Sequence, residues 1–338
     1  MQYLYVLVST INDIYYEQFL LSATSLKLKM PDAEITLLCD SKTKDTLIGK
    51  RNGYEKLVSK IVNVDTPDGF SHIEVSRWLK TSMRRFVQGD FLFIDCDTII
   101  TEDLSQINGL GITFGACLDK HSLLDRHAKS KAIIGQEQQL GFTSHLSNRH
   151  LNSGIIYCAD IPETHNIFDR WHELWLFSNS KNIVRDQPSF NMAIHENSAL
   201  FTELDGKWNC QIAFNGLPFL SSSKIIHYFA SDLALHTSPF SLASNTIFQT
   251  IKTTGTIPSE TVELLKYPKT AFVPESRIIA DNDVLYVFNS SFFESILLLR
   301  QKAPIIFHFF NGLASFGKKI TKFFLVKTNK NGGIKHYN

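Results

Sequence analysis

The stretch Phe91-Leu92-Phe93-Ile94-Asp95-Cys96-Asp97-Thr98 decides the fold expected of this chain. Its four leading apolar residues predict a buried strand, and the strand's period of two places the carboxylates of Asp95 and Asp97 on one face. Open α/β sheets bind ligands at the carboxyl ends of strands, where two close carboxylates suit a hard divalent cation. The alternative is that both aspartates begin a polar loop, because Asp-x-Asp is a common pattern.

Outward from this stretch, strand and helix patterns alternate along the chain. Short apolar runs predict strands over Tyr3–Val8, Glu34–Cys39, Ser59–Val64, Phe91–Ile94, Thr113–Leu118 and Gly154–Tyr157. Amphipathic patterns predict helices over Tyr16–Lys29, Thr43–Asn52, Ser76–Gln88, Glu163–Ser178 and Gln187–Glu196. Such alternation is typical of an α/β fold in which a mostly parallel sheet carries helices on both faces.

The C-terminal part of the chain has a different composition. Alternation fades after Ser231, so we predict a first domain over residues 1–235 and a mostly helical extension over 236–338, with a helix at Ser291–Lys302. Residues 296–338 contain eight Lys or Arg, six Phe and no Asp or Glu. A basic, aromatic segment of this kind suits the surface of an anionic membrane. The alternative is that the aromatic residues pack as a helical cap on the first domain, with solvated lysines.

Composition and the cysteines favour the cytoplasm. No apolar run reaches the ~18 residues of a membrane span, and the N-terminus has no basic region of the kind that begins a signal peptide. The five cysteines form no Cys-x-x-Cys pair, which fits a reducing compartment. We therefore expect a cytoplasmic protein, peripheral at the inner face of the plasma membrane if residues 296–338 bind lipid. No nucleic-acid partner is expected.

Three further residues have the chemistry to complete a cation site for a phosphorylated ligand. His227 directly follows the two isoleucines of Lys224-Ile225-Ile226-His227-Tyr228, at the end of a short predicted strand. A neutral imidazole there suits the role of a third ligand for the cation. Arg77 and Lys80 are three residues apart on a predicted helix, where two cations suit a diphosphate. The alternatives are a histidine with ordinary structural hydrogen bonds and a solvated helix face.

Two polar segments lie next to predicted elements. Asn152-Ser153-Gly154 precedes a predicted strand, and Asp186-Gln187 precedes a predicted helix. Turn and N-cap chemistry explains both, although the same amides and carboxylate could bind sugar hydroxyls. Gly109-Leu110-Gly111 opens no helix and lacks a third glycine at the required spacing, so it is not a dinucleotide-binding motif. The chain has no Walker-type phosphate loop.

In this order, these segments resemble the family-8 glycosyltransferases of the GT-A fold, a group that includes glycogenin and bacterial galactosyltransferases. The resemblance covers roughly residues 3–232. For the metal, it implies Asp95, Asp97 and His227; for the donor, Thr10, Asn12, Tyr15, Arg77 and Ser153; and for catalysis, Lys80, Asn152, Asp186 and Gln187. The family's His-x-x-Gly-x-x-Lys motif is incomplete, because Ala230 replaces its glycine and no lysine follows at the expected place.

The resemblance implies a metal-dependent transfer of a hexose from a UDP-sugar to the hydroxyl of a glycan or glycolipid acceptor, with retention of anomeric configuration. It further implies Mn²⁺ or Mg²⁺ as cofactor and a place in bacterial surface-glycan synthesis. Two other hypotheses stay open on the sequence alone. The chain could bind nucleotide sugars without catalysis, or act at the membrane surface through its C-terminal segment.

Overall fold

The computed structural model describes residues 1–228, 242, 244–271, 286–287 and 290–329, with side chains described through residue 317. The chain divides into two compact units, Met1–Ile278 and Ile279–Asn338. The domain boundary predicted near residue 235 lies outside the described residues and stays a prediction.

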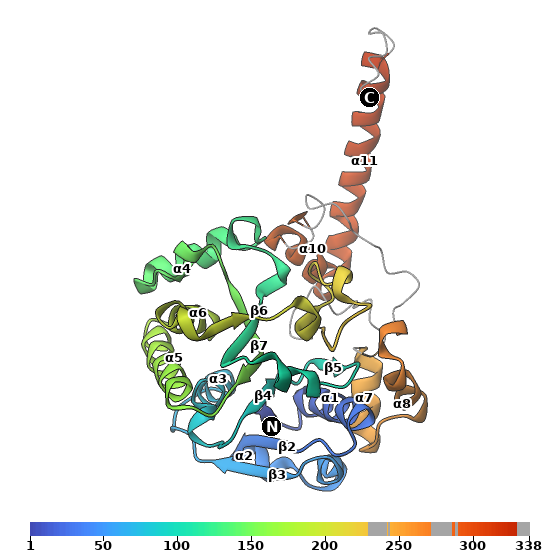
Figure 1. Ribbon diagram of the computed structural model, residues 1–338. Helices are drawn as coiled ribbons and strands as arrows, with labels where there is room; N and C mark the ends of the chain where they lie inside the picture. Colours follow the sequence, from blue (N-terminus) through green and yellow to red (C-terminus); the bar gives the residue numbers. More distant parts are fainter. Residues whose placement is uncertain (229–241, 243, 272–285, 288–289, 330–338) are drawn as a thin grey trace. The chain divides into compact units, whose positions relative to one another are not determined.

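The first unit is built on a seven-stranded sheet of order β3-β2-β1-β4-β7-β6-β8 (Figure 1). Its strands are β1 (Gln2–Leu7), β2 (Ile35–Asp40), β3 (Lys60–Val64), β4 (Phe91–Ile94), β6 (Phe114–Leu118), β7 (Leu151–Cys158) and β8 (Phe201–Glu203). Only β7 runs against its neighbours in this sheet, pairing antiparallel with β4 and β6. The predicted α/β fold with a mostly parallel sheet is confirmed.

Helices cover both faces of this sheet (Figure 1). One hydrophobic core includes residues of α1, α7 and α8, and the other includes residues of α3, α5 and α6. The helices of the first unit are α1 (Tyr15–Lys29), α2 (Ser41–Thr46), α3 (His72–Ser82), α4 (Ser130–Leu140), α5 (Pro162–Ser180), α6 (Gln187–Glu196), α7 (Asn245–Thr254) and α8 (Ser259–Lys266).

The continuous apolar runs of the strands follow from this double coverage. In β4, Leu92 belongs to the core on the α1 side, whereas Phe93 belongs to the core on the α3 side. Both side chains are almost fully buried. A strand with helices on both faces needs apolar residues at every position rather than at alternate ones.

A second, three-stranded sheet positions the polar residues that follow β4. It has the order β5-β10-β9 and consists of β5 (Thr98–Ile100), β9 (Cys210–Gln211) and β10 (Ile225–His227). In the antiparallel pairing of β5 with β10, His227 lies opposite Thr98. Since Asp97 directly precedes Thr98, this register places the end of β10 beside the Asp-x-Asp segment.

Two predicted helices differ from the structure. The helix predicted over Thr43–Asn52 is wrong in its second half: α2 ends at Thr46, and Gly49, with φ +58°, begins a 3₁₀ turn. The helix predicted over Ser76–Gln88 begins earlier, at His72, because Ser71 and Glu74 form a capping box at its N-terminus. It also ends earlier, at Ser82, where a 3₁₀ turn follows. Neither difference removes a predicted site residue from its element.

The position of the Asn152-Ser153-Gly154 segment also differs from the prediction. These residues do not precede a strand but lie inside β7, which begins at Leu151. Sequence reasoning starts the strand too late because polar residues are unusual in a buried strand. All eight residues of β7 are nevertheless buried, so the polar side chains of this segment need internal partners.

The second unit contains α10 (Ser291–Lys302), as predicted, and α11 (Pro304–Asn329). Between Ser291 and residue 317 many large apolar side chains are exposed, with Ile305 at 85% and Phe292 at 73%. Among the helices that the structure describes, none is both long enough and apolar enough to cross a bilayer.

Candidate functional site

Asp95, Asp97 and His227 form a cluster at the meeting point of the two sheets. One potential ligand atom from each side chain lies within 4.8 Å of the others. Asp95 is held where β4 ends, because its backbone N–H donates to the Gly154 carbonyl of β7 at 2.8 Å. Asp97 is held at the start of β5, and its carbonyl accepts from the Tyr228 N–H at 3.1 Å. The structure therefore brings together the three residues predicted as metal ligands.

The electrostatics of this cluster favour a cation. Nε2 of His227 lies 3.2 Å from Oδ1 of Asp97. Burial is the largest single influence on Asp97 and would raise its pKa, but His227, a backbone hydrogen bond and Lys80 together lower it. Burial raises the pKa of Asp95, which shows that its charge is less well compensated. Two carboxylates and an imidazole are a donor set that Mn²⁺ and Mg²⁺ accept, so the residues present fit a divalent ion.

Lys80 links the cluster to the N-terminus of α6. Its buried ammonium lies 3.1 Å from both carboxylate oxygens of Asp95 and 3.7 Å from Oδ2 of Asp186. Arg77, one turn earlier on α3, binds Oδ1 of Asp186 through Nε at 3.1 Å. The two cations thus share a helix face, as the sequence predicts, but that face is paired with carboxylates and is not an ordinary solvated one.

Asp186 is the carboxylate that Lys80 and Arg77 share. Burial is the largest single influence on Asp186 and would raise its pKa, but Lys80, Arg77 and hydrogen bonds that include the one from Ser153 together lower it to about 2. Ser153 donates to Oδ2 of Asp186 at 2.7 Å from β7. The Asp186 carboxylate makes no capping bond to α6, so N-cap chemistry does not explain this residue. An ionised carboxylate held by Ser153, Arg77 and the nearby charge of Lys80 is a rigid acceptor for a ligand hydroxyl.

Asn152 and Gln187 are bonded within the protein. The Asn152 side chain accepts from Gly154 N–H at 2.9 Å, and donates to Asp119 Oδ1 at 2.8 Å. Gln187 donates to the Leu151 carbonyl at 3.3 Å and is half-buried. Gln187 is therefore tied to β7, whereas Asn152 belongs to a network that reaches the cluster through Asn209.

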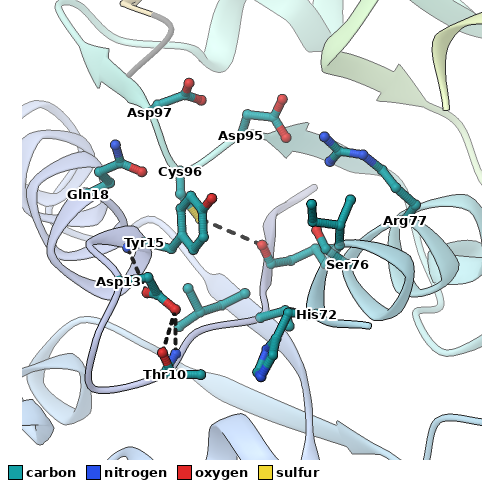
Figure 2. A pocket seen from close by; sticks show the side chains of 14 residues that line it. Thr10, Asp13, Tyr15, Gln18, His72, Ser76, Arg77, Asp95, Cys96 and Asp97 are labelled. Atoms are coloured by element: carbon teal, nitrogen blue, oxygen red, sulfur yellow. Dashed lines mark hydrogen bonds between the residues drawn. The ribbon is translucent and has the colours of Figure 1, made fainter. Parts of the chain in front are cut away.

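A pocket of about 390 Å³ opens beside the cluster (Figure 2). Five of the predicted site residues line it: Thr10, Tyr15, Arg77, Asp95 and Asp97. Figure 2 shows the guanidinium of Arg77 turned toward Asp95, with the ring of Tyr15 below the Asp-x-Asp segment. Asn12, also predicted here, is exposed and is not among the residues that line the pocket.

The loop that carries Thr10 and Tyr15 is organised by Asp13, which sequence reasoning missed. The Asp13 carboxylate accepts from Ser9 Oγ at 2.6 Å, from the Thr10 N–H and hydroxyl at 2.6 and 2.9 Å, and from the Tyr15 N–H at 3.1 Å. Lys252 of α7 also bonds to the Asp13 carbonyl. The signal was the spacing Ser-Thr-x-x-Asp, in which one carboxylate can close a loop on its own backbone.

Comparisons with known proteins are consistent with this arrangement. A family model described as "Glycosyl transferase family 8" matches residues 6–232, a range that includes the whole Asp95, Asp97 and His227 cluster. No curated protein matches the chain.

Several solved structures are similar at low identity. The apo form of mouse xyloside xylosyltransferase 1 shares 13% identity over 67% of this chain and 96% of its own, with a TM-score of 0.43. The galactosyltransferase LgtC, in complex with donor and acceptor sugar analogs, shares 15% identity over 77% of this chain and 98% of its own, with a TM-score of 0.49. The glycosyltransferase GlyE of Streptococcus pneumoniae TIGR4 shares 14% identity over 82% of this chain and 67% of its own, with a TM-score of 0.47.

Proposed function

Because the chain belongs to glycosyl transferase family 8 and is a glycosyltransferase, we propose that it transfers a hexose from a UDP-sugar to an acceptor hydroxyl with the aid of a divalent cation. The observation that carries this proposal is the position of the Asp95, Asp97 and His227 cluster at the edge of an open pocket. A carboxylate-rich cluster next to a pocket of this size suits a ligand that carries phosphate and metal together.

In this proposal Asp95, Asp97 and His227 hold Mn²⁺ or Mg²⁺. The cation, when bound, neutralises the negative charge that develops on the diphosphate as the sugar departs. Arg77 is the protein cation best exposed for the same purpose, since its side chain is 35% accessible and lines the pocket. A well-placed donor of this kind contributes about 3 kcal/mol to the transition state.

Lys80 has a different task in our proposal. Its ammonium is almost fully buried and lies between Asp95 and Asp186. From there it would attract both carboxylates and bridge them, which would orient Asp95 toward the cation and Asp186 toward the sugar. Removing one partner of a buried ionic group leaves the others uncompensated, at a cost of roughly 3–5 kcal/mol in stability.

Asp186 and Ser153 would orient the donor sugar or the incoming hydroxyl. Asp186 stays ionised throughout the neutral range because its pKa is lowered to about 2, so it accepts hydrogen bonds from sugar hydroxyls without taking a proton. Gln187 follows Asp186 at the start of α6 and would assist through its half-buried amide. Asn152, whose amide is bonded on both sides, would support the site through its neighbours.

Tyr15 would stack on the uracil base, while Thr10 and Asn12 would hold the ribose. The Tyr15 side chain is 44% exposed and lines the pocket, so an incoming base can reach its ring. The retaining outcome and the role in bacterial surface-glycan synthesis follow from the family resemblance and complete the proposal. Glycans and glycolipids are the expected acceptors.

We further propose that the second unit binds an anionic membrane. The eight basic residues of 296–338 occur with no acidic residue, and exposed aromatic side chains accompany them on α11, including Phe309 at 63% and Phe316 at 65%. Each basic residue near an anionic surface contributes about 1 kcal/mol before screening. A membrane partner would place the pocket near lipid-linked acceptors.

The experiment is a screen of UDP-sugars for binding in the presence of Mn²⁺, followed by a glycan acceptor array with the donor that binds. The proposed function requires UDP release that depends on metal and is stimulated by acceptor. Donor binding without release supports a non-catalytic binder, and acceptor-independent release supports a donor hydrolase. Asp68→Asn, at an exposed aspartate that belongs neither to the cluster nor to the pocket lining, serves as the matched control for cluster variants.

A further inference from the structure

Asn209 is a fully buried residue that contacts the metal-binding cluster without belonging to it. It ends the 3₁₀ helix Gly206–Asn209, directly before β9, which pairs in parallel with β10. Its Oδ1 lies 3.0 Å from Nδ1 of His227, and its Nδ2 lies 2.9 Å from Oδ1 of Asn152. The Asn209 amide thus connects the imidazole of His227 to the side chain of Asn152.

The orientation of the Asn152 amide is decided by two groups whose roles cannot be exchanged. The backbone N–H of Gly154 can only donate, and it faces the Asn152 side chain at 2.9 Å. The carboxylate of Asp119, 2.8 Å away on the other side, accepts. Burial is the largest single influence on Asp119 and would raise its pKa, but the hydrogen bond with His127 and the nearby His150 and Lys120 together lower it, so Asp119 is ionised. The Asn152 oxygen therefore points toward Gly154 and its nitrogen toward Asp119.

The orientation of the Asn152 amide determines the orientation of the Asn209 amide. The Asn152 oxygen also faces Asn209 at 2.9 Å, so the Asn209 atom at this contact must be the donating nitrogen. The Asn209 oxygen is then the atom that faces His227, and Nδ1 of His227 must carry a hydrogen to be bonded by it. Both amide orientations are therefore assigned from the Gly154 N–H and the Asp119 carboxylate, whose donor and acceptor roles are fixed.

From this geometry, and given the cation of the proposed function, we propose that Asn209 is a positioning residue that fixes the tautomer and ring orientation of His227. With the hydrogen on Nδ1, the lone pair of the neutral imidazole is on Nε2, the nitrogen that lies 3.2 Å from Asp97. Outer partners of this kind commonly orient metal-binding histidines, and their loss typically lowers metal affinity 10–100-fold. Asn209 acts through His227 and touches neither donor nor acceptor.

The tautomer is measured first, by NMR on the metal-free full-length protein with ¹⁵N-labelled histidine at mildly alkaline pH. All proteins carry Asp97→Ala in this measurement only, because the Asp97 carboxylate lies 3.2 Å from Nε2 and would compete for the hydrogen. The His227 signals are identified by their absence from the spectrum of His227→Gln. We expect the hydrogen on Nδ1 in the Asp97→Ala parent and after the addition of Asn209→Asp, whose carboxylate keeps the accepting oxygen. Asn209→Leu removes that oxygen, and we expect the Nδ1–H form to lose its dominance.

Metal affinity is measured next, by electron paramagnetic resonance of free Mn²⁺ in titrations of the same variants. We expect Asn209→Leu to bind Mn²⁺ 10–100-fold more weakly and Asn209→Asp to recover most of that loss. Asn191→Leu is the matched control, because it removes another buried amide, one that bonds to Leu151. We expect it to lower stability while the His227 tautomer stays unchanged.

The proposal is overturned if neutral His227 carries its hydrogen on Nε2 in the Asp97→Ala parent, or if Asn209→Leu changes neither the tautomer nor Mn²⁺ binding. It is also overturned if Asn191→Leu shifts the tautomer as far as Asn209→Leu does, since the effect would then be general loosening of the fold. A wild type that binds no Mn²⁺ would contradict the cation of the proposed function, and the tautomer measurement would still decide the part played by Asn209.

Discussion

Gly154 of β7 faces the imidazole of His227 so closely that a β-carbon at Gly154 would lie 2.5 Å from Cε1 of His227. The same β-carbon would lie 2.9 Å from Oδ2 of Asp95. Real β-carbons do not approach other atoms to such distances, so glycine is required here for packing and not for a special backbone angle. Because Gly154 of β7 has no side chain, it leaves room for His227 and Asp95 in the cluster.

We predict that Gly154→Ala displaces His227 and Asp95 and abolishes Mn²⁺-dependent transfer. Overpacking a buried position costs about 1–3 kcal/mol, so the fold should survive. The control is Gly135→Ala on α4, where an added β-carbon meets no atom within 4 Å. Turnover and Mn²⁺ titrations check the prediction, and normal metal affinity in Gly154→Ala would show that the cluster tolerates the shift.

A second prediction concerns Tyr15. Replacement by alanine should raise KM for the UDP-sugar more than it lowers kcat, because a stacking partner of the base is lost at about 1–3 kcal/mol while the reacting bond is untouched. Tyr15→Phe should retain the donor affinity. Tyr267→Ala, at a tyrosine that is 70% exposed, is the control. An unaltered KM in Tyr15→Ala would exclude the stacking role.

The pH dependence of stability should reveal a buried neutral histidine on α5. Burial lowers the pKa of His172 to about 4, below the value expected in the unfolded chain. The unfolded chain therefore binds more protons between about pH 4 and 6.5, and the free energy of unfolding should fall as the pH falls through that range. Between pH 7 and 5 this residue should account for up to about 2 kcal/mol.

Denaturant titrations at both pH values, on the wild type and on His172→Gln, measure this effect. The difference in unfolding free energy between the two pH values should be smaller in the variant by that amount. His308→Gln, at an exposed histidine, should behave like the wild type. An equal pH dependence in His172→Gln and the wild type would mean that His172 is not the titrating group.

Membrane binding is predicted to depend on the exposed aromatic residues of α11. The full chain should sediment with vesicles of phosphatidylserine and phosphatidylcholine at low salt and be released as salt rises. Replacing Phe309, Phe310 and Phe316 by serine should leave most of the protein in the supernatant. The same exchange at Ile48, which is 73% exposed in the first unit, should have no effect. A wild type that stays in the supernatant would instead favour a helical cap.

The sequence predicts the sheet and the cluster well, for identifiable reasons. The run Phe91–Ile94 is apolar at every position because both faces of β4 are covered, and this pattern distinguishes a central strand from a surface one. The pair Asp95 and Asp97 follows it directly, so its place at a strand end can be predicted without knowing the neighbouring strands.

Other features depend on register between distant segments and cannot be read from a local pattern. Asn209 reaches His227 only because β9 pairs with β10 over two positions, and neither short strand has a distinctive sequence. Lys80 pairs with both Asp95 and Asp186 because α3 lies close to the N-terminus of α6, and no local sequence pattern predicts that proximity. The polar residues at the start of β7 are likewise not predicted as part of the strand, because the partners that allow them to be buried come from other elements.

The most direct measurement is UDP release by Asp97→Asn at saturating Mn²⁺, donor and acceptor, compared with the wild type and with Asp68→Asn. If the Asp95, Asp97 and His227 cluster holds the cation for sugar transfer, the wild type and Asp68→Asn should both lose activity on chelation and regain it with Mn²⁺. Asp97→Asn should stay folded and inactive at every Mn²⁺ concentration. Turnover by Asp97→Asn comparable to that of the wild type would contradict the metal-site account.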